Sequence, residues 1–159
     1  MSDDIGIDQS TVIFFDASCL FTAAGSPSGG SGFLVSVCHR GFLSGATSQG
    51  AILEARRRIA TKLGNIATER FDEFVVPSLV VLVPIPSSTQ RARLDGLINP
   101  KDQHVVAAAL ILNAQFVITH DLSLVEEVRR ASISVEALTP GDFLTDYLPL
   151  HRDFFIIRG

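Results

Sequence analysis

The sequence predicts an α/β fold, a three-layer α/β/α sandwich in which helices cover both faces of a mostly parallel sheet. Short apolar segments alternate with longer helical patterns from end to end, and no repeat or linker interrupts them. Hydrophobic residues make up 47% of the chain, which suits strands buried on both faces. A chain of 159 residues can bury a core, so we expect a single domain spanning residues 1–159.

The first part of the chain is expected to supply three strands, each followed by helices. The strand at 12–15 is wholly apolar, which favours a central place in the sheet. Residues 25–32 are rich in Gly and Ser, which predicts a flexible loop. Ser48 can cap the helix that follows the second strand. The predicted strands are 12–15, 42–47 and 79–83, and the predicted helices are 18–23, 33–40, 49–63 and 66–74.

The second part of the chain continues the alternation. A proline-marked turn at Asn99-Pro100 leads into an Ala-rich helix, and a short apolar strand follows it. The predicted helices are 90–97, 102–113, 122–130 and one that starts at Thr139, and the predicted strands are 116–119 and 133–135. Residues 145–159 form a C-terminal extension, whose apolar segment 153–158 is predicted to add a strand or to form an interface.

Composition restricts the functional classes. The formal net charge of −4 is not typical of a general nucleic-acid binder, although arginines can still gather on one face. Cys19 and Cys38 give neither a disulfide framework nor a zinc spacing. Asp3 and Asp4 replace the basic start of a signal peptide, and no apolar run reaches the roughly 18–20 residues of a membrane span. We therefore expect a cytoplasmic protein with no membrane segment.

Four acidic residues stand at positions that a parallel sheet gathers at one edge. Asp16 and Asp121 each end a predicted strand. Asp102 opens a predicted helix, and Glu54 lies early in another. Carboxylates that face one another repel unless a cation lies between them. Hard oxygen ligands suit Mg²⁺ or Mn²⁺, and the absence of a Cys/His cluster argues against zinc.

Each acid also has a structural explanation. Asp102 and Asp121 could be N-caps of the helices that follow them, which stabilises by about 1 kcal/mol. Glu54 falls opposite the apolar stripe of its helix and could form a solvated pair with Arg58, one turn later. Asp16 is harder to explain in this way, because it directly follows four apolar residues.

The four acids lie in the segments FFDAS (14–18), ILEA (52–55), DQHVVAAA (102–109) and VITHD (117–121). In this order and spacing, the segments resemble the four acidic motifs of the PIN domain family. ISV (133–135) and TPGDFL (139–144) resemble the closing strand and helix of that family. The resemblance covers nearly the whole chain and implies a five-stranded parallel sheet of order 3-2-1-4-5.

The resemblance implies a metal-dependent endoribonuclease, with Mg²⁺ or Mn²⁺ as cofactor and RNA as substrate. The residues that would hold the metal and position its water are Asp16, Glu54, Asp102 and Asp121. Ser18 and Thr119 match the hydroxyls that would support a carboxylate or a bound water. Many small members are VapC-type toxins, which are held by an antitoxin protein and commonly form homodimers. The 25–32 loop and the tail beyond Leu144 depart from a minimal toxin.

Two functions of other classes remain open. A non-catalytic PIN-like module could bind RNA or a protein without turnover, and the negative charge and the apolar tail are compatible with this. An aspartate-based phosphotransfer domain is the second alternative. It fits less well, because a phosphatase of this kind needs an acid where Ser18 stands and a receiver needs a lysine after a late strand.

Overall fold

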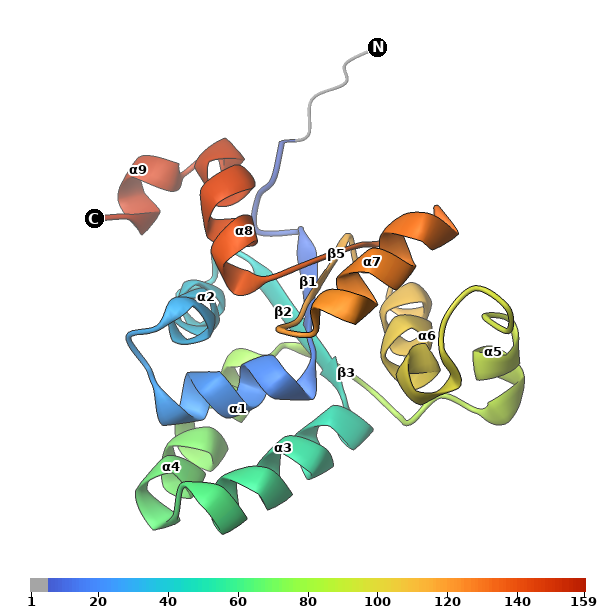
Figure 1. The fold of residues 1–159 in the computed structure, drawn as a ribbon. Coiled ribbons are helices and arrows are strands. Elements are labelled where there is room, and N and C mark those ends of the chain that lie inside the picture. The colour runs from blue at the N-terminus through green and yellow to red at the C-terminus, as the bar shows by residue number, and fades with distance from the viewer. Residues whose placement is uncertain (1–5) are drawn as a thin grey trace.

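The computed structural model describes residues 6–159, so Asp3 and Asp4 lie outside the described residues. Its strands are β1 (Val12–Phe15), β2 (Ser44–Ser48), β3 (Val81–Val83), β4 (Phe116–Ile118) and β5 (Glu136–Leu138). They form one parallel sheet in the order β3-β2-β1-β4-β5 (Figure 1). The predicted strand order is confirmed.

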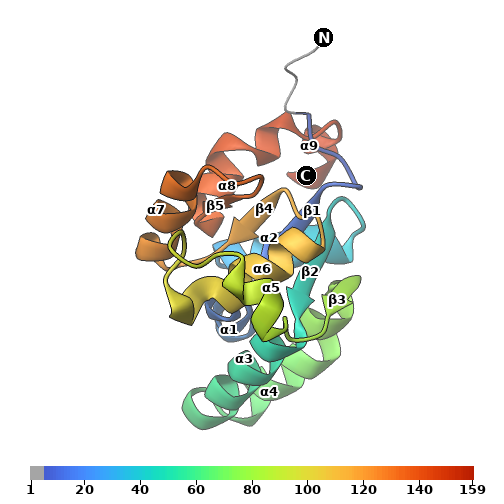
Figure 2. The same cartoon turned by 90° about the vertical axis from the view of Figure 1, so that its right-hand side faces the viewer.

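Helices cover both faces of the sheet, which confirms the predicted three-layer architecture (Figures 1 and 2). The helices on one face are α1 (Ala17–Gly25), α2 (Gly30–His39), α3 (Gln49–Lys62), α4 (Asn65–Arg70), α8 (Pro140–Asp146) and α9 (Phe154–Ile157). The same face also carries a π-helical turn, η1 (Phe71–Val75), and the 3₁₀ turns η2 (Val76–Ser78) and η4 (Leu148–Leu150). The other face carries α5 (Ser88–Ala92), the 3₁₀ turn η3 (Pro100–Asp102), α6 (Gln103–Ile111) and α7 (Leu122–Ala131).

The central strand β1 belongs to both hydrophobic cores. Side chains alternate between the two faces of a strand, so Ile13 and Phe15 enter the core beneath α1 and α2, and Phe14 enters the core beneath α6 and α7. All three side chains are fully buried. A strand covered on both faces has no solvent-facing position, which explains why the sequence of β1 is apolar without alternation.

Parallel pairing brings the ends of β1 and β4 to the same edge of the sheet. Phe14 lies opposite Ala46 of β2 and Val117 of β4. Directly after β1, the Asp16 N–H donates to the Ile118 carbonyl at 3.0 Å, so the ladder continues to the first residue beyond the strand. The side chains that follow β1 and β4 therefore lie next to each other.

The prediction of a flexible loop over 25–32 is wrong in extent. Helix α2 already begins at Gly30, and the short connection before it is closed by a hydrogen bond from the Gly29 N–H to the Ser26 carbonyl at 3.0 Å. Gly32 is buried, and a Cβ atom at this position would collide with the backbone of Pro27. The glycine is thus needed for close packing of α2 rather than for chain flexibility.

The predicted strand at 133–135 is displaced. Strand β5 is Glu136–Leu138, because α7 ends in a left-handed residue, Ser132 (φ 52°), and the chain needs the next residues to return to the sheet. The predicted helix at 90–97 is also shorter. It ends as α5 at Ala92, and turns that include Gly96 (φ 81°) complete the segment.

The C-terminal extension packs on the fold as helical turns, so the added strand predicted for 153–158 is wrong. Arg40, the C-cap residue of α2, donates to the carbonyls of Ile156 and Ile157 at 3.3 and 3.0 Å, and the Ile157 side chain is buried in the core. His151 donates from Nε2 to the Phe42 carbonyl at 2.6 Å and accepts the Asp153 N–H at Nδ1. These contacts fix the extension against α2 and the start of β2.

Replacing Gly32 by Ala should lower the melting temperature. An added methyl group within a helix normally stabilises by about 1 kcal/mol, but overpacking in a buried position costs about 1–3 kcal/mol. Gly141→Ala in α8 is the matched control, because a Cβ atom there would make only an ordinary contact, 4.0 Å from the Thr139 hydroxyl oxygen. Thermal denaturation of both variants checks this. Equal melting temperatures for Gly32→Ala and the wild type would show that the connection between α1 and α2 moves to accommodate the added methyl group, as a flexible loop would.

Candidate metal centre

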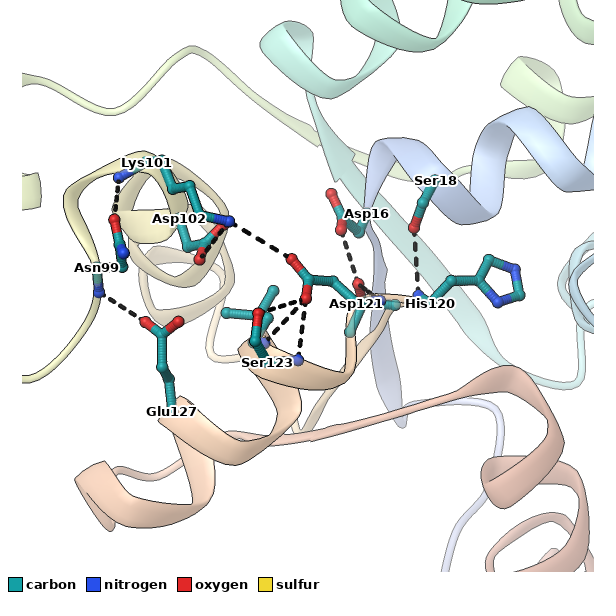
Figure 3. A network of polar contacts seen from close by, with 11 residues as sticks. Asp16, Ser18, Asn99, Lys101, Asp102, His120, Asp121, Ser123 and Glu127 are labelled. Atoms are coloured by element: carbon teal, nitrogen blue, oxygen red, sulfur yellow. Dashed lines mark hydrogen bonds and ion pairs between the residues drawn. The ribbon is translucent and has the colours of Figure 1, made fainter.

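Three of the four predicted acids lie together where β1 and β4 end and where α6 and α7 begin (Figure 3). Asp16 follows β1, Asp121 follows β4 by three residues, and Asp102 ends the turn before α6. Figure 3 shows the Asp102 and Asp121 side chains on either side of the Lys101 ammonium, with Asp16 next to Asp121.

Thr119 connects Asp16 to Asp121. Its hydroxyl donates to Oδ2 of Asp16 at 2.8 Å and accepts the Asp121 N–H at 3.1 Å. The Thr119 side chain is fully buried, so this hydroxyl is protected from water. The other Asp16 oxygen, Oδ1, accepts the Ala17 N–H at 2.7 Å at the start of α1. The Asp16 carboxylate is therefore fixed in orientation by both neighbouring elements.

Asp121 is the N-cap of α7, as the structural explanation predicted. Its Oδ1 accepts the N–H groups of Ser123 and Leu124 at 3.0 and 3.3 Å and the Ser123 hydroxyl at 2.7 Å. These hydrogen bonds, led by that of the Ser123 side chain, hold the pKa of Asp121 below its usual 3.8. The cap engages only one oxygen, and Oδ2 faces the ammonium of Lys101 at 3.8 Å.

Asp102 is in a different environment, and the N-cap explanation is wrong for it. The residue is 8% exposed and its side chain makes no capping hydrogen bond. Within residues 6–159, its buried Oδ2 has no hydrogen-bond partner. Burial raises the pKa of Asp102 above 3.8; the Lys101 charge opposes this, and the charges of Glu127 and Asp121 add to it. Its charged partner among the described residues is the largely exposed Lys101 ammonium, which lies 3.6 Å away and beyond hydrogen-bond distance.

Sequence reasoning missed two residues of this site, Lys101 and Glu127. Lys101 Nζ lies 3.6 Å from Oδ2 of Asp102 and 3.8 Å from Oδ2 of Asp121. Glu127 Oε1 accepts the Asn99 N–H at 2.6 Å, and Asn99 Oδ1 accepts the Lys101 N–H at 3.1 Å (Figure 3). Glu127 thus ties α7 to the turn that carries Lys101. Its position one helical turn after Ser123 was the only signal in the sequence.

Glu54 lies apart from this network. It is half-buried in α3, and among residues 6–159 no hydrogen bond or ion pair joins it to the other three acids. The alternative pair with Arg58 is not formed either, because the Arg58 guanidinium lies over the Phe21 ring, 4.9 Å from its centroid. The structure therefore leaves Glu54 without a partner that explains it.

Ser18 is near the acids, but its hydroxyl serves the backbone. It accepts the His120 N–H at 3.3 Å and makes no carboxylate contact among the described residues. The His120 ring points away from the acids (Figure 3), and its Nε2 lies 3.0 Å from the Thr22 hydroxyl. His120 thus joins the end of β4 to α1 and does not face the carboxylates.

The described residues hold no ready-made metal cluster: within 6–159, no three His, Cys, Asp or Glu side chains converge closely enough to hold an ion. The donors nevertheless fit a hard divalent cation. They are carboxylate oxygens, one of them is buried without a partner, and a lysine ammonium already lies between two of them. The chemistry of these donors is therefore compatible with a hard cation, and Asp16, Asp102 and Asp121 remain the predicted oxygen ligands.

Asp102 and Asp121 should affect stability in opposite directions when metal is absent. At pH 7 in a chelator, Asp102→Asn should raise the melting temperature by about 1–4 °C, since it removes a desolvated charge. The folded state holds the Asp102 proton more tightly than the unfolded chain, so stability falls as pH rises above 3.8. The gain should accordingly shrink when the pH is lowered toward 4.

The contrasting variant is Asp121→Ala, which should lose about 1 kcal/mol of cap stabilisation. The folded-state pKa of Asp121 is lowered, so this contribution is present above pH 3.8 and is lost as the pH falls below it. Thermal denaturation from pH 4 to pH 8 checks both variants. A wild type that is more stable than Asp102→Asn at pH 7 would contradict the assignment of Asp102 as a buried carboxylate that Lys101 compensates only in part.

Comparison with solved structures gives the same fold. A chain of the crystal structure of VapBC2 from Rickettsia felis bound to a DNA fragment from their promoter superposes with a TM-score of 0.59. The match has 13% identity and covers 81% of this chain and 98% of that chain. PAE2754 from Pyrobaculum aerophilum superposes with a TM-score of 0.53 and 18% identity, over 86% of this chain and 92% of that chain.

The sequence has no match among curated proteins. Among the helices of residues 6–159, none combines the length and hydropathy that a membrane-spanning helix needs. A sequence model described as PIN domain matches residues 12–123, which is more than two thirds of the chain and includes all four predicted acids. The chain therefore belongs to the PIN domain family, a family of nucleases.

Proposed function

We propose that this protein is a Mg²⁺- or Mn²⁺-dependent endoribonuclease that hydrolyses RNA phosphodiester bonds. The observation that carries the proposal is the buried Oδ2 of Asp102, which has no hydrogen-bond partner within residues 6–159 and faces the carboxylate-rich end of β4. Buried carboxylates are usually hydrogen-bonded or closely paired, whereas the ion pair of this oxygen with Lys101, at 3.6 Å, is longer than a hydrogen bond. A divalent cation would satisfy it.

Each acid has a distinct part in this proposal. Asp102 and Asp121 would hold the metal through the oxygens that now face Lys101. Asp16 would contribute from β1, with its carboxylate oriented by Thr119. Glu54, which makes no hydrogen bond or ion pair with the residues that the structure describes, would be the fourth acid. The bound ion would stabilise the charge that develops on the phosphodiester and lower the pKa of the attacking water.

We further propose that the chain is a cytoplasmic toxin of a toxin–antitoxin pair. The support is the fold shared with a chain of VapBC2 from Rickettsia felis, a structure that is bound to a DNA fragment from their promoter. The partner would be a cognate antitoxin protein.

A homodimer is also part of the proposal, and the β3 edge of the sheet is the surface that supports it. β3 is the last strand on its side, and Val80 and Leu82 are 70% and 50% exposed there, with Ile85 exposed nearby. An apolar, unpaired edge strand is a ready pairing surface. Leu82→Lys should shift the protein toward monomer in light scattering, whereas Ile66→Lys on α4 should not. A wild-type protein that is monomeric in light scattering would contradict the proposed homodimer.

A non-catalytic PIN-like module that binds RNA or protein is the second candidate. It is favoured by the lack of a converged metal cluster among the described residues and by the lysine that already balances two of the acids. In such a module the acids would only shape the charge of the surface. The two candidates differ in whether metal binds and whether RNA is cut.

RNA cleavage in Mn²⁺ tests the leading proposal. Asp16→Asn and Asp102→Asn should each reduce cleavage by at least about a hundredfold, the loss typical of removing a group that stabilises the transition state. Asp142→Asn, an exposed acid of α8, is the matched control and should cut like the wild type. Mutants as active as the wild type would exclude these acids from catalysis.

Calorimetry separates the second candidate. Mn²⁺ should produce binding heat with the wild type and Asp142→Asn, and little heat with Asp102→Asn. Binding of RNA that does not depend on Mn²⁺, together with no cleavage by any variant, would instead support the binding module.

A further inference from the structure

Lys101 occupies the position between the two carboxylates that a metal ion would need. Its Nζ is 3.6 Å from Oδ2 of Asp102 and 3.8 Å from Oδ2 of Asp121 (Figure 3). We propose that Lys101 is an internal counter-cation, which keeps the metal centre closed until a divalent ion displaces its ammonium. This inference rests on the proposed metal-dependent function and concerns how that same site is regulated.

The contacts of the ammonium are those of a displaceable group. Both N···O distances exceed the range of a hydrogen bond, so the two pairs are electrostatic and loosely held. The Lys101 side chain is 63% exposed, and solvent can therefore receive it when it leaves. Among residues 6–159, no other lysine or arginine pairs with Asp102 or Asp121 within 4.0 Å.

The carboxylates nevertheless need a positive charge when metal is absent. Asp102 is 8% exposed, and Glu127 and Asp121 place two further negative charges near it. Like charges in a partly desolvated site repel one another more than they would in water. The ammonium reduces that repulsion, which lets the apo protein keep the acids together.

The backbone of this turn is fixed, so only the lysine side chain has to move. Asn99 is held by Glu127 of α7 through its N–H and holds the Lys101 N–H through Oδ1, at 2.6 and 3.1 Å. Mg²⁺ binds oxygen ligands at about 2.0–2.1 Å, and an ammonium this close to the same oxygens would be repelled by the ion. Metal binding and the Lys101 ion pairs therefore exclude each other.

Mn²⁺ titration by calorimetry tests this competition. Lys101→Gln should bind Mn²⁺ about three- to tenfold more tightly than the wild type, the range expected for releasing one or two exposed ion pairs. Lys101→Arg, which keeps the charge, should stay close to the wild type. Lys62→Gln is the matched control, because Lys62 is the only other lysine of the chain and lies exposed at the end of α3. Equal or weaker Mn²⁺ binding by Lys101→Gln would overturn the inference.

A second measurement needs no metal. In a chelator, Lys101→Gln should lower the melting temperature by about 1–3 °C, and at least half of that loss should vanish in the Asp102→Asn background. Lys62→Gln should behave alike in both backgrounds. If Lys101→Gln lowers the melting temperature equally in the wild-type and Asp102→Asn backgrounds, Lys101 does not stabilise the Asp102 carboxylate.

The two proposals fail in different ways. If neither the wild type nor any variant binds Mn²⁺, Lys101→Gln included, the metal centre itself is absent and the proposed function fails. If Asp102→Asn abolishes Mn²⁺ binding while Lys101→Gln binds like the wild type, the metal centre stands and the counter-cation role of Lys101 is wrong.

Discussion

Burial of a carboxylate without a hydrogen-bond donor is the constraint on which this site depends. An isolated ionised group loses several kcal/mol on leaving water, so a fold keeps one only where a cation or a proton can compensate. At Asp102 the described part of the chain, residues 6–159, provides neither a helix cap nor a hydroxyl for Oδ2. The need to compensate this buried charge explains the groups that surround Asp102. Lys101 lies close enough to lower the local potential, and Asp121 presents a second oxygen to the same point.

The scaffold explains why this constraint is met at one edge of the sheet. β1 is buried on both faces, so the first polar residue after it emerges at the rim next to the end of β4. There a buried threonine joins the two strands by donating to Asp16 and accepting from Asp121. Asp16 and Asp121 each use one oxygen to start a helix, which leaves them rigid as well as charged. A catalytic group gains from such rigidity, since positioned charge needs no reorganisation during reaction.

The sequence alone predicts most of the scaffold for physical reasons that act locally. An apolar strand ending on Asp16, a Ser48 cap and an Ala-rich helix after Asn99-Pro100 are each encoded by a few adjacent residues. The errors arise where distant packing decides. In the sequence, Gly32 indicates a loop, and only the structure shows that the Pro27 backbone packs against it. The start of β5 is likewise set by a distant contact, the pairing of Glu136 with Phe116. Lys101 and Glu127 could not be identified, because their importance comes from α7 approaching the turn before α6. Whether Glu54 joins the other acids depends on α3, which no local pattern positions.

The most direct test of the account is a crystal structure of the protein soaked in Mn²⁺, with anomalous scattering used to locate the ion. We expect a single dominant anomalous peak within ligand distance of Oδ2 of Asp102 and Oδ2 of Asp121, with the Lys101 side chain turned out to solvent. An anomalous map with no peak at these oxygens, while Lys101 Nζ still lies between them, would contradict it.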